Sequence, residues 1–400
     1  MNSYNHSNSI NIKDERLTKM KSDKTLIEKF TSPFKSDMYD GLLYDGDYSP
    51  EKKFPVDLSN GENPLGCSPL VKQRIEESLN RIDKYPECQY RGLVSALSEF
   101  HKKPESNFVV TSGANGALLA TIAAFIGKGD SIVMPALSFQ TPAMEVNVRG
   151  GYIIAAPLRE DMRVDLEALR KNIQPNTKLI YFCNPNNPTG LKLPASDIRN
   201  FARSVNIPVL VSEANVEYSG ESIMDSDDIP NNLISARSFS KAYGLAGLRI
   251  GYAICSTENA VKLLKHLSPY MVSTVSQVAA EAALEDVNHL KISVKYMNGE
   301  RKYVSEKMAA LGFEVLSSDA NNVLAIISDQ IPNSTVFANE LADRGCSIVD
   351  GARFLGLSHR AVRIVPRTRD INDNFLSICS EIIDKYSSHK TTIASKPKNK

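Results

Sequence analysis

The sequence predicts an α/β protein, in which a large domain with a seven-stranded, mostly parallel sheet is joined to a smaller α+β domain. Two observations predict this fold class. From Asn107 onward, short β-branched runs alternate with helical stretches, which is the pattern that a parallel sheet requires. The chain, at 400 residues with 42% hydrophobic composition, is also long enough to bury one large core and a smaller satellite core.

The large domain is expected to contain all seven strands of the parallel sheet. The last strand leads into an Ala-rich helical segment near 272–286 and then into a long connecting helix over 291–311. The seven strands are predicted at 107–111, 131–134, 152–156, 178–182, 208–212, 233–237 and 250–254.

The smaller unit follows the connecting helix, and residues 46–75 are expected to return to it. We therefore divide the chain into a small domain of residues 46–84 and 295–386 and a large domain of residues 85–294. The strands of the small domain are predicted near 313–317, 322–327, 345–349 and 361–365, and its helices near 333–343 and 371–386.

The two ends of the chain have compositions that do not favour a packed core. Residues 1–45 are rich in Asn, Ser, Lys and Asp and contain few large apolar residues, so we expect a mobile N-terminal arm. Residues 387–400 end in Lys-Pro-Lys-Asn-Lys and are predicted to be a disordered tail, with solvated lysines rather than a binding patch.

Charge and composition exclude several classes of function. The formal net charge of +1 gives no electrostatic case for a nucleic-acid or membrane-surface partner. No apolar stretch is long enough to span a bilayer, and the N-terminus is polar rather than signal-like. The six cysteines and six histidines are scattered, without metal or disulfide spacing. We therefore expect no metal site and a reduced, cytoplasmic protein.

One stretch, residues 238–249, concentrates chemically useful side chains. Lys241 lies between serines and a Gly-rich turn, and Arg249 follows eight positions later. A lysine near a basic residue and away from bulk water loses proton affinity, as an imine-forming amine must. Serine hydroxyls and an arginine fork suit a phosphate on the same ligand. Pyridoxal phosphate carries both an aldehyde and a phosphate, so this segment is predicted to bind it. The alternative interpretation is that the segment is an ordinary charged surface loop.

Two further loops are placed to touch the same ligand. The segment Asn184–Gly190 contains three Asn and two Pro and follows the apolar run 179–182, so it is predicted to be a strand-end turn. Ligands of open α/β sheets lie beyond the carboxyl ends of strands. Residues 111–116 join the first predicted strand to a helix, whose N-terminal N–H groups can face an anion.

These segments resemble pyridoxal-phosphate aminotransferases of the aspartate aminotransferase fold (fold type I), in particular the histidinol-phosphate aminotransferase branch. The resemblance extends to residues 57–66 and to Tyr-Pro-Glu-Cys-Gln at 85–89, and it covers residues 50–385 in the order of the family. Leu65 and Tyr90-Arg91 are similar to the related threonine-phosphate decarboxylases. The resemblance implies pyridoxal 5'-phosphate as cofactor and a homodimer.

The resemblance also implies a role for each of eleven residues. Lys241 binds the coenzyme covalently and moves the substrate proton, and Arg363 holds the substrate carboxylate. The remaining residues bind the coenzyme: Gly113, Ala114, Asn115, Ser238 and Arg249 at its phosphate, Tyr85 reaching the phosphate from the other subunit, and Asn187, Ser212 and Asn215 at its ring. Four nearby arginines can serve an extra anionic group or be solvated charges, namely Arg353, Arg360, Arg367 and Arg369.

The chain departs from the family pattern at the ring. The family places Asp-Glu-Ala-Tyr where this chain has Ser-Glu-Ala-Asn at 212–215, so a serine replaces the carboxylate that pairs with the protonated ring nitrogen. Leu137 stands where an aromatic residue usually stacks on the coenzyme, with Phe139 as its substitute. Val349 takes the place of the arginine that binds the substrate phosphate in histidinol-phosphate enzymes.

The sequence therefore predicts a pyridoxal-phosphate-dependent aminotransferase acting on an amino acid, an amino acid-like amine or an amino acid phosphate, rather than on histidinol phosphate itself. Ser212 and Asn215 motivate one alternative, a decarboxylase or lyase of a (phospho)amino acid. A second alternative is a coenzyme-binding protein without catalytic activity.

Overall fold

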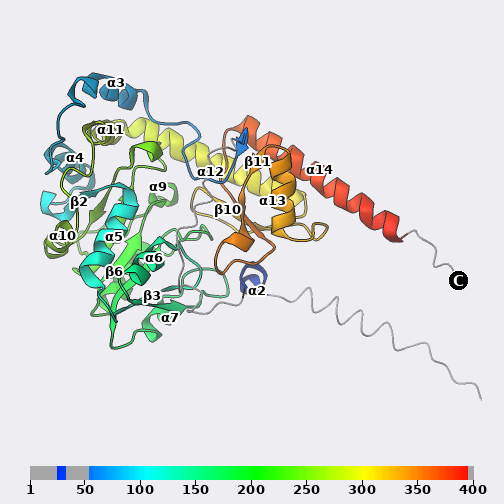
Figure 1. The fold of residues 1–400 in the computed structure, drawn as a ribbon, viewed down its shortest axis with the longest axis horizontal. Helices are drawn as coiled ribbons and strands as arrows, with labels where there is room; N and C mark the ends of the chain where they lie inside the picture. The colour runs from blue at the N-terminus through cyan, green and yellow to red at the C-terminus, as the bar shows by residue number, and fades with distance from the viewer. Residues whose placement is uncertain (1–24, 33–53, 395–400) are drawn as a thin grey trace, which may run out of the picture.

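The computed structural model describes residues 25–32 and 54–394 and places two units side by side, joined by a long helix (Figure 1). The long helix, α12 (Val287–Ala310), has 24 residues and runs from the larger unit to the smaller one. In the described ranges, four short 3-10 helices lie in the loops: η2 (Leu79–Arg81), η3 (Glu105–Asn107), η4 (Ala246–Leu248) and η5 (Gly351–Arg353).

The larger unit is built on a seven-stranded sheet, as predicted. The strands follow the order β2-β8-β7-β6-β5-β3-β4, and only β8 runs antiparallel to its neighbours. The strand bounds differ from the predicted ranges by a residue at most: β2 (Phe108–Thr111), β3 (Ser131–Pro135), β4 (Tyr152–Ala156), β5 (Thr177–Cys183), β6 (Val209–Ser212), β7 (Leu233–Ser238) and β8 (Gly251–Ile254).

Helices cover both faces of this sheet because successive strand residues point to opposite faces. In β3, Val133 belongs to one apolar core, whereas Ile132 and Met134 belong to the other. The covering helices are α4 (Arg91–His101), α5 (Gly113–Phe125), α6 (Thr141–Val148), α7 (Leu166–Lys171), α8 (Ala195–Arg203), α9 (Val216–Ser219), α10 (Thr257–Leu264) and α11 (Thr274–Glu285).

The smaller unit is an α+β domain, as predicted. Its four-stranded antiparallel sheet has the order β12-β13-β10-β9, and β1 (Val56–Asp57) pairs in parallel with β11 (Cys346–Ser347). The predicted strand at 345–349 is therefore divided between β11 and β12. The other elements are β9 (Glu314–Val315), β10 (Val323–Ile326), β12 (Val349–Asp350), β13 (Ala361–Ile364), α13 (Ser334–Asp343) and α14 (Arg369–Ala394).

Part of the predicted mobile arm is instead docked on the domains. Residues Leu26–Phe30 form the short helix α2, which begins with a capping box at Thr25. Phe30 is fully buried, and its carbonyl accepts a hydrogen bond from Ser358 N at 2.9 Å. Ile27 also packs against the core, and Lys29 pairs with Glu314 at 2.9 Å, so several contacts hold this segment within a polar stretch. The rest of the predicted arm lies outside the described residues.

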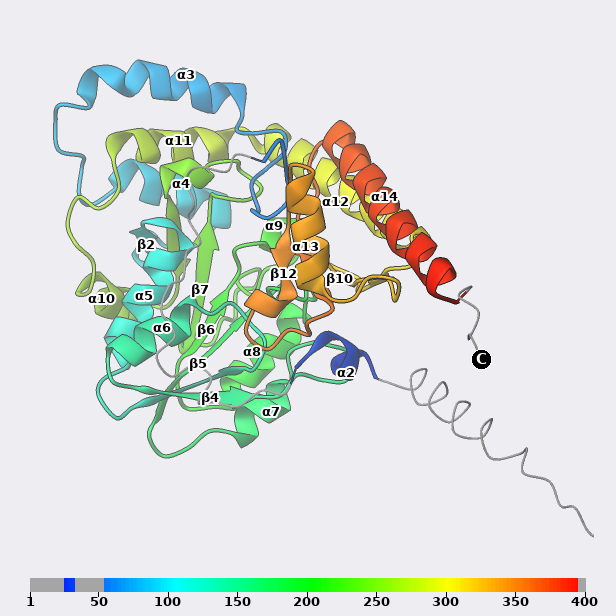
Figure 2. The same ribbon diagram turned by 45° about the vertical axis from the view of Figure 1, so that its right-hand side comes forward.

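Two predicted boundaries also differ from the structure. Helix α3 (Pro69–Ser78) lies along α11 of the large domain (Figure 2), and its Val71 is buried in the large-domain core, although we placed residues 46–84 in the small domain. Helix α14 continues to Ala394, beyond the predicted end at 386, and residues 387–394 contain no proline or glycine that would interrupt it. Residues 395–400 of the predicted disordered tail lie outside the described residues.

The large sheet presents its carboxyl edge to the small domain. Thr111 of β2, Cys183 of β5, Ser212 of β6 and Ser238 of β7 end their strands at this same edge, because these strands are mutually parallel. In the described part of the chain, no helix combines the length and the apolar character that crossing a bilayer requires.

Candidate active site

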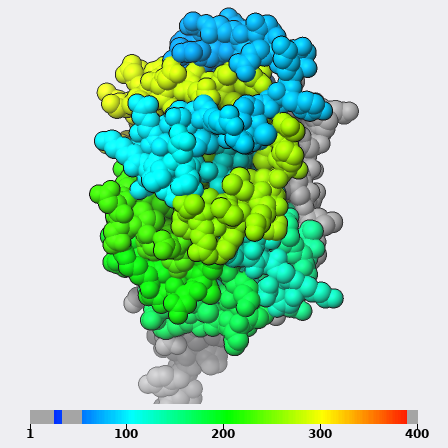
Figure 3. Space-filling view, turned by 90° about the vertical axis from the view of Figure 1, so that its left-hand side faces the viewer, coloured from blue at the N-terminus to red at the C-terminus, as the bar shows by residue number. Residues whose placement is uncertain are grey.

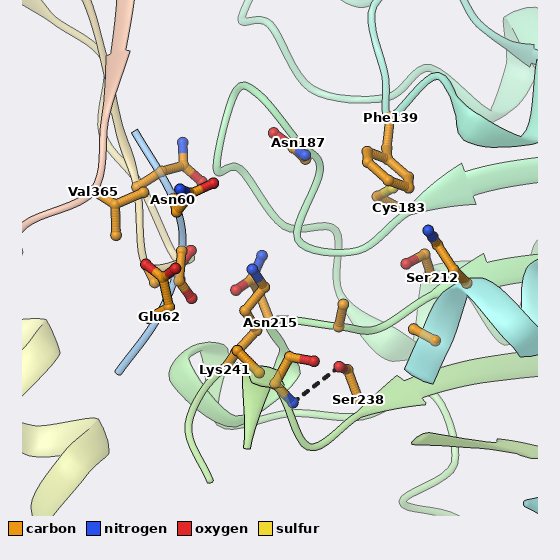
Figure 4. Close-up of a pocket in the computed structure, with 18 of the residues that line it drawn as sticks. Asn60, Glu62, Phe139, Cys183, Asn187, Ser212, Asn215, Ser238, Lys241 and Val365 are labelled. Atoms are coloured by element: carbon orange, nitrogen blue, oxygen red, sulfur yellow. Dashed lines mark hydrogen bonds between the residues drawn. The ribbon is translucent and has the colours of Figure 1, made fainter. Parts of the chain in front are cut away.

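A cavity of about 560 Å³ lies at the carboxyl edge of the large sheet, between the two domains (Figure 4). This volume is typical of a site for a small molecule or cofactor. Nine of the eleven predicted site residues line it: Ala114, Asn115, Asn187, Ser212, Asn215, Ser238, Lys241, Arg249 and Arg363.

One end of the cavity is an anion cradle built on the start of helix α5. The residue before the helix, Ser112, makes no side-chain cap, so the first N–H groups of α5 are left for another acceptor. Gly113 has a φ of 72°, and a Cβ added there would lie 2.9 Å from Nη2 of Arg249. Glycine therefore allows the guanidinium to approach the helix end closely, although Gly113 itself does not line the cavity.

The turn after β7 holds Arg249 in this position. Its Nη1 donates to the carbonyl of Ala246 at 2.9 Å and to Oγ of Ser240 at 3.3 Å. Ser238 Oγ accepts a hydrogen bond from Ser240 N at 3.1 Å, drawn as the dashed line in Figure 4. The cradle thus combines a guanidinium, hydroxyl groups and helix N–H groups, which together suit a phosphate.

Lys241 projects into the cavity next to this cradle. Burial, and the positive charges of Arg363 and Arg249, lower the pKa of Lys241 to about 8, against the opposing effect of Glu62. A Cβ added at Gly61 would lie only 2.7 Å from its Nζ, so glycine makes the space for the amine. Lys241 is therefore a lysine prepared for nucleophilic chemistry.

Arg363 approaches the cavity from strand β13 of the small domain. Its Nη1 donates to Oδ1 of Asn187 at 3.0 Å, and its Nη2 donates to the carbonyl of Ser59 at 2.8 Å. Its Nε is buried without a hydrogen-bond partner among the described residues. Burial lowers the pKa of Arg363 to about 10, so an anionic ligand would stabilise this guanidinium.

Only one of the three asparagines in the predicted loop lines the cavity. Asn184 exchanges two hydrogen bonds with the backbone of Leu193, and Asn186 donates to the carbonyl of Leu137. These two side chains hold the loop in shape, so Asn187 alone projects into the cavity. Phe139 also lines the cavity, whereas Leu137 is buried in the core, which makes Phe139 the aromatic residue available for stacking.

The part of the cavity wall formed by the end of β6 contains no carboxylate among the described residues. Ser212 presents a hydroxyl there, and Oδ1 of Asn215 is buried without a hydrogen-bond partner in the same part of the chain. Glu213 points to the other face of the sheet, where Ser222 and Ser235 donate to it at 2.8 and 2.6 Å. Among the described residues, the end of β6 therefore brings a neutral hydroxyl and a neutral amide to the cavity, and no negative charge.

Tyr85 does not line the cavity of its own chain. Its side chain is 85% exposed, and its ring lies 5.0 Å from the ring of Tyr270, centroid to centroid. Leu79 and Ile82 are also exposed near it in sequence. Figure 3 shows α3 in blue at the top of one face of the molecule, and α11, on which it packs, lies directly below it in yellow.

The four arginines considered for an extra anionic group make contacts within the fold or lie away from the cavity. Arg360 donates to four backbone carbonyls, Arg367 pairs with Glu62 at 2.6 Å, and Arg369 pairs with Glu300 at 2.7 Å. These three are therefore not simply solvated charges. Arg353 does not line the cavity either, so none of the four arginines is placed to bind a second anion there.

Sequence reasoning missed several residues that line the cavity from the small-domain side. They are Asn60 and Glu62 in the segment after β1, and Asn321 and Asn322 before β10. Asn321 donates to the carbonyl of Gly61 at 3.1 Å, and Asn322 donates to that of Pro188 at 2.8 Å. A polar pair directly before a buried strand is the signal that would have found the last two.

The residues of this cavity fit pyridoxal phosphate. The uncapped helix end and Arg249 suit its phosphate, and the Lys241 amine suits its aldehyde. An anion cradle and a lysine of lowered pKa at the edge of this sheet define a pyridoxal-phosphate-dependent enzyme of fold type I.

Comparisons with known proteins give the family. The model of aminotransferase class I and II matches residues 54–377, and the chain belongs to this family. It is 31% identical over 336 residues to the histidinol-phosphate aminotransferase of Methanococcoides burtonii, covering 84% of this chain and 92% of that protein. It is 33% identical over 345 residues to histidinol-phosphate aminotransferase 2 of Archaeoglobus fulgidus, covering 86% and 97% respectively.

Solved structures agree with the fold. The histidinol-phosphate aminotransferase of Sinorhizobium meliloti, in complex with pyridoxal-5'-phosphate, superposes with a TM-score of 0.73 at 25% identity, covering 83% of this chain and 92% of that chain. The L-threonine-O-3-phosphate decarboxylase of Porphyromonas gingivalis also superposes with a TM-score of 0.73, at 22% identity, and covers 82% and 99%. The expected aspartate aminotransferase-like fold and pyridoxal-phosphate dependence are therefore confirmed.

Proposed function

We propose that this aminotransferase acts on an α-amino acid whose carboxylate binds Arg363, and not on histidinol phosphate. The observation that carries the proposal is the Nε of Arg363, buried without a partner among the described residues, on a guanidinium that already faces the cavity. A planar fork of this kind matches a carboxylate.

The charges of the cavity support the choice of an unphosphorylated substrate. Among the described residues, the only lysine and arginine side chains that line it are Lys241, Arg249 and Arg363. Arg249 belongs to the cradle that suits the coenzyme phosphate, and Lys241 supplies the amine. Among the described residues of one chain, only Arg363 then remains for the substrate, which is sufficient for one carboxylate but provides no second cation for a substrate phosphate.

The chain's own residues would divide the work as follows. The bound coenzyme supplies an aldehyde for the substrate amino group and a ring that withdraws electrons. Arg363 orients the substrate through its carboxylate, and Asn187 holds the guanidinium in place. Lys241 Nζ removes the proton from the substrate α-carbon and returns a proton during the second half of the reaction. Phe139 covers part of the cavity wall and excludes water from it.

Among the described residues, no carboxylate faces the cavity from the end of β6, and this favours one second candidate, a decarboxylase or lyase with the same coenzyme. A serine gives the ring nitrogen a hydrogen bond but no compensating charge, which changes the relative rates of competing bond cleavages. The same Arg363 site would bind the amino acid in either case.

We also propose that the active form is a homodimer. Leu79, Ile82 and Tyr85 are exposed apolar residues of the segment after α3, and Tyr85 contacts the exposed Tyr270; a second copy of the chain would cover them. In such a dimer Tyr85 would reach the coenzyme phosphate of the partner's site.

The six cysteines are all free, which supports the expectation of a reducing, cytoplasmic setting.

Product analysis with purified, coenzyme-loaded protein tests the proposed function. A panel of α-amino acids, phosphorylated amino acids and histidinol phosphate would be supplied with 2-oxoglutarate as amino acceptor. Formation of a keto acid from an unphosphorylated amino acid, abolished in Lys241→Ala, is the expected result. Turnover of histidinol phosphate at the highest kcat/KM would overturn the substrate proposal, and carbon dioxide or ammonia without an acceptor would favour the second candidate.

A further inference from the structure

The wall of the cavity at the end of β6 has an electrostatic property that concerns the coenzyme ring itself. The inference rests on coenzyme binding and holds whichever substrate is used. The cradle at α5 would hold the phosphate of the coenzyme, and Lys241 would hold its aldehyde. In pyridoxal phosphate the ring nitrogen is para to the aldehyde-bearing carbon, so it points away from the lysine. Figure 4 shows Ser212 across the cavity from Lys241, at the end of its strand.

No negative charge of the described residues faces this wall. Glu213, the neighbour of Ser212, lies on the other face of β6, where Ile223 N donates to it at 2.9 Å. Glu217 pairs with Arg237 at 2.8 Å, and both of these side chains are 6% exposed. The carboxylates nearest in sequence to Ser212 are therefore committed to a separate buried network, with Arg237 as its cation.

Within the described ranges, the only acidic residue that lines the cavity is Glu62, on the small-domain side. Its carboxylate is already paired with Arg367 at 2.6 Å. The cavity also contains the positive groups of Arg249 and Arg363. A protonated ring nitrogen at this wall would be a desolvated cation without a carboxylate partner among the described residues, which disfavours the protonated form.

Ser212 can instead satisfy a neutral nitrogen. Its side chain is 5% exposed, and its hydroxyl makes no hydrogen bond to another described residue. A hydroxyl can donate its proton to an unprotonated ring nitrogen, which is an acceptor. We propose that this enzyme holds its coenzyme with the ring nitrogen unprotonated, as the acceptor of a hydrogen bond from Ser212.

This state would make Ser212 a determinant of reactivity. An unprotonated ring withdraws electrons less strongly, so removal of the substrate α-proton by Lys241 is slower than it would be opposite a carboxylate. Ser212→Asp is expected to accelerate α-proton exchange about ten- to a hundredfold, which is the effect of supplying one charge-assisted partner.

Nitrogen-15 NMR of the protein loaded with ring-labelled pyridoxal phosphate tests the proposal directly. In the wild-type protein we expect the chemical shift of an unprotonated pyridine, unchanged between pH 6 and 9. A protonated shift in the wild type would overturn the proposal, whatever the variants do. The nitrogen-15 chemical shift is measured without substrate and without catalytic turnover, so it does not depend on the proposed function.

Two variants separate the local effect of Ser212 from the total charge of the cavity. Ser212→Asp is expected to give the protonated shift, whereas Asn60→Asp, which adds a carboxylate elsewhere on the cavity wall, is expected to leave the unprotonated shift. Ser212→Ala keeps the site neutral, and we expect it to remain unprotonated while losing the hydrogen bond. Protonation in Asn60→Asp but not in Ser212→Asp would contradict the assignment of Ser212.

Discussion

Arg363 Nη1 donates to Oδ1 of Asn187 at 3.0 Å, across 176 residues of sequence and from one domain to the other. Arg363 belongs to strand β13 of the small domain, and Asn187 belongs to the loop after β5 of the large domain. The guanidinium that we assign to the substrate carboxylate is therefore aligned by a neutral group of the opposite domain. A neutral partner orients the fork without competing for its charge.

Replacing that neutral partner by a charged one should weaken substrate binding. In Asn187→Asp the new carboxylate would pair with Arg363 and compete with the substrate carboxylate. We expect KM for the amino acid to rise about ten- to a hundredfold, the effect of one charge-assisted hydrogen bond. Steady-state kinetics measures the KM, with Asn187→Ala as the control variant. An equal rise in KM in the two variants would show that competition for Arg363 is not the cause.

The lowered pKa of Lys241 should be visible in the pH dependence of coenzyme uptake. Only the neutral amine attacks an aldehyde, so the rate of covalent uptake should rise about tenfold per pH unit and level off above a pH of about 8. For a lysine with the ordinary pKa of 10.5, the uptake rate would continue to rise up to a pH near that value. Stopped-flow absorbance of the coenzyme-free protein gives the profile.

Arg363→Met provides the matched variant for this profile. Burial is the main cause of the lowered pKa, and the positive charge of Arg363 is the next. A positive neighbour disfavours the protonated amine. Removal of the Arg363 charge should therefore raise the pKa of Lys241 and move the midpoint of the uptake profile to higher pH. A midpoint that moves to lower pH would contradict this sign.

Gly244 and Gly247 offer a paired test of backbone constraint in one turn. Gly244 has a φ of 74°, and a Cβ there would lie 2.7 Å from Cys67 N, whereas a Cβ at Gly247 meets nothing within 4 Å. Gly244→Ala should lower the free energy of unfolding by at least about 2 kcal/mol, and Gly247→Ala by less than about 0.5 kcal/mol. Denaturant unfolding of the two coenzyme-free variants compares them, and equal effects would refute the contact with the 66–67 segment.

Mixed dimers test the placement of Tyr85. If Tyr85 serves the partner's site, a heterodimer of Tyr85→Ala and Lys241→Ala chains contains one site with both native residues. Mixing the two inactive proteins under exchanging conditions should therefore restore activity. Activity that never returns, although mass spectrometry detects the heterodimer, would show that Tyr85 acts elsewhere.

Much of this structure could be predicted from local sequence pattern. The seven strands of the large sheet were predictable because buried parallel strands are short continuous apolar runs, and β5 and β6 are examples. The placement of Lys241, Asn187 and Arg363 around one cavity followed from resemblance, because their positions in family order imply a shared site.

Other features depend on contacts that no local pattern encodes. The docking of α2 depends on the buried Phe30 and on the pairing of Lys29 with Glu314, which is 285 residues away in sequence. The placement of α3 depends on its packing against α11. The contacts of Asn321 and Asn322 with the segments at 61 and 188 arise from the approach of the two domains. Arg360 and Arg369 find partners inside the small domain and on α12 that a count of charges cannot assign.

Gly61 shows how far the influence of the lysine extends. A single added carbon at this position would stand 2.7 Å from Lys241 Nζ and 2.9 Å from Asn321 Nδ2. Gly61 carries no reactive group, yet any larger residue there would displace the amine on which the chemistry depends. A genetic screen for inactive enzyme should therefore recover substitutions at position 61 that mimic loss of the lysine, in protein that is folded and retains every chemically active side chain.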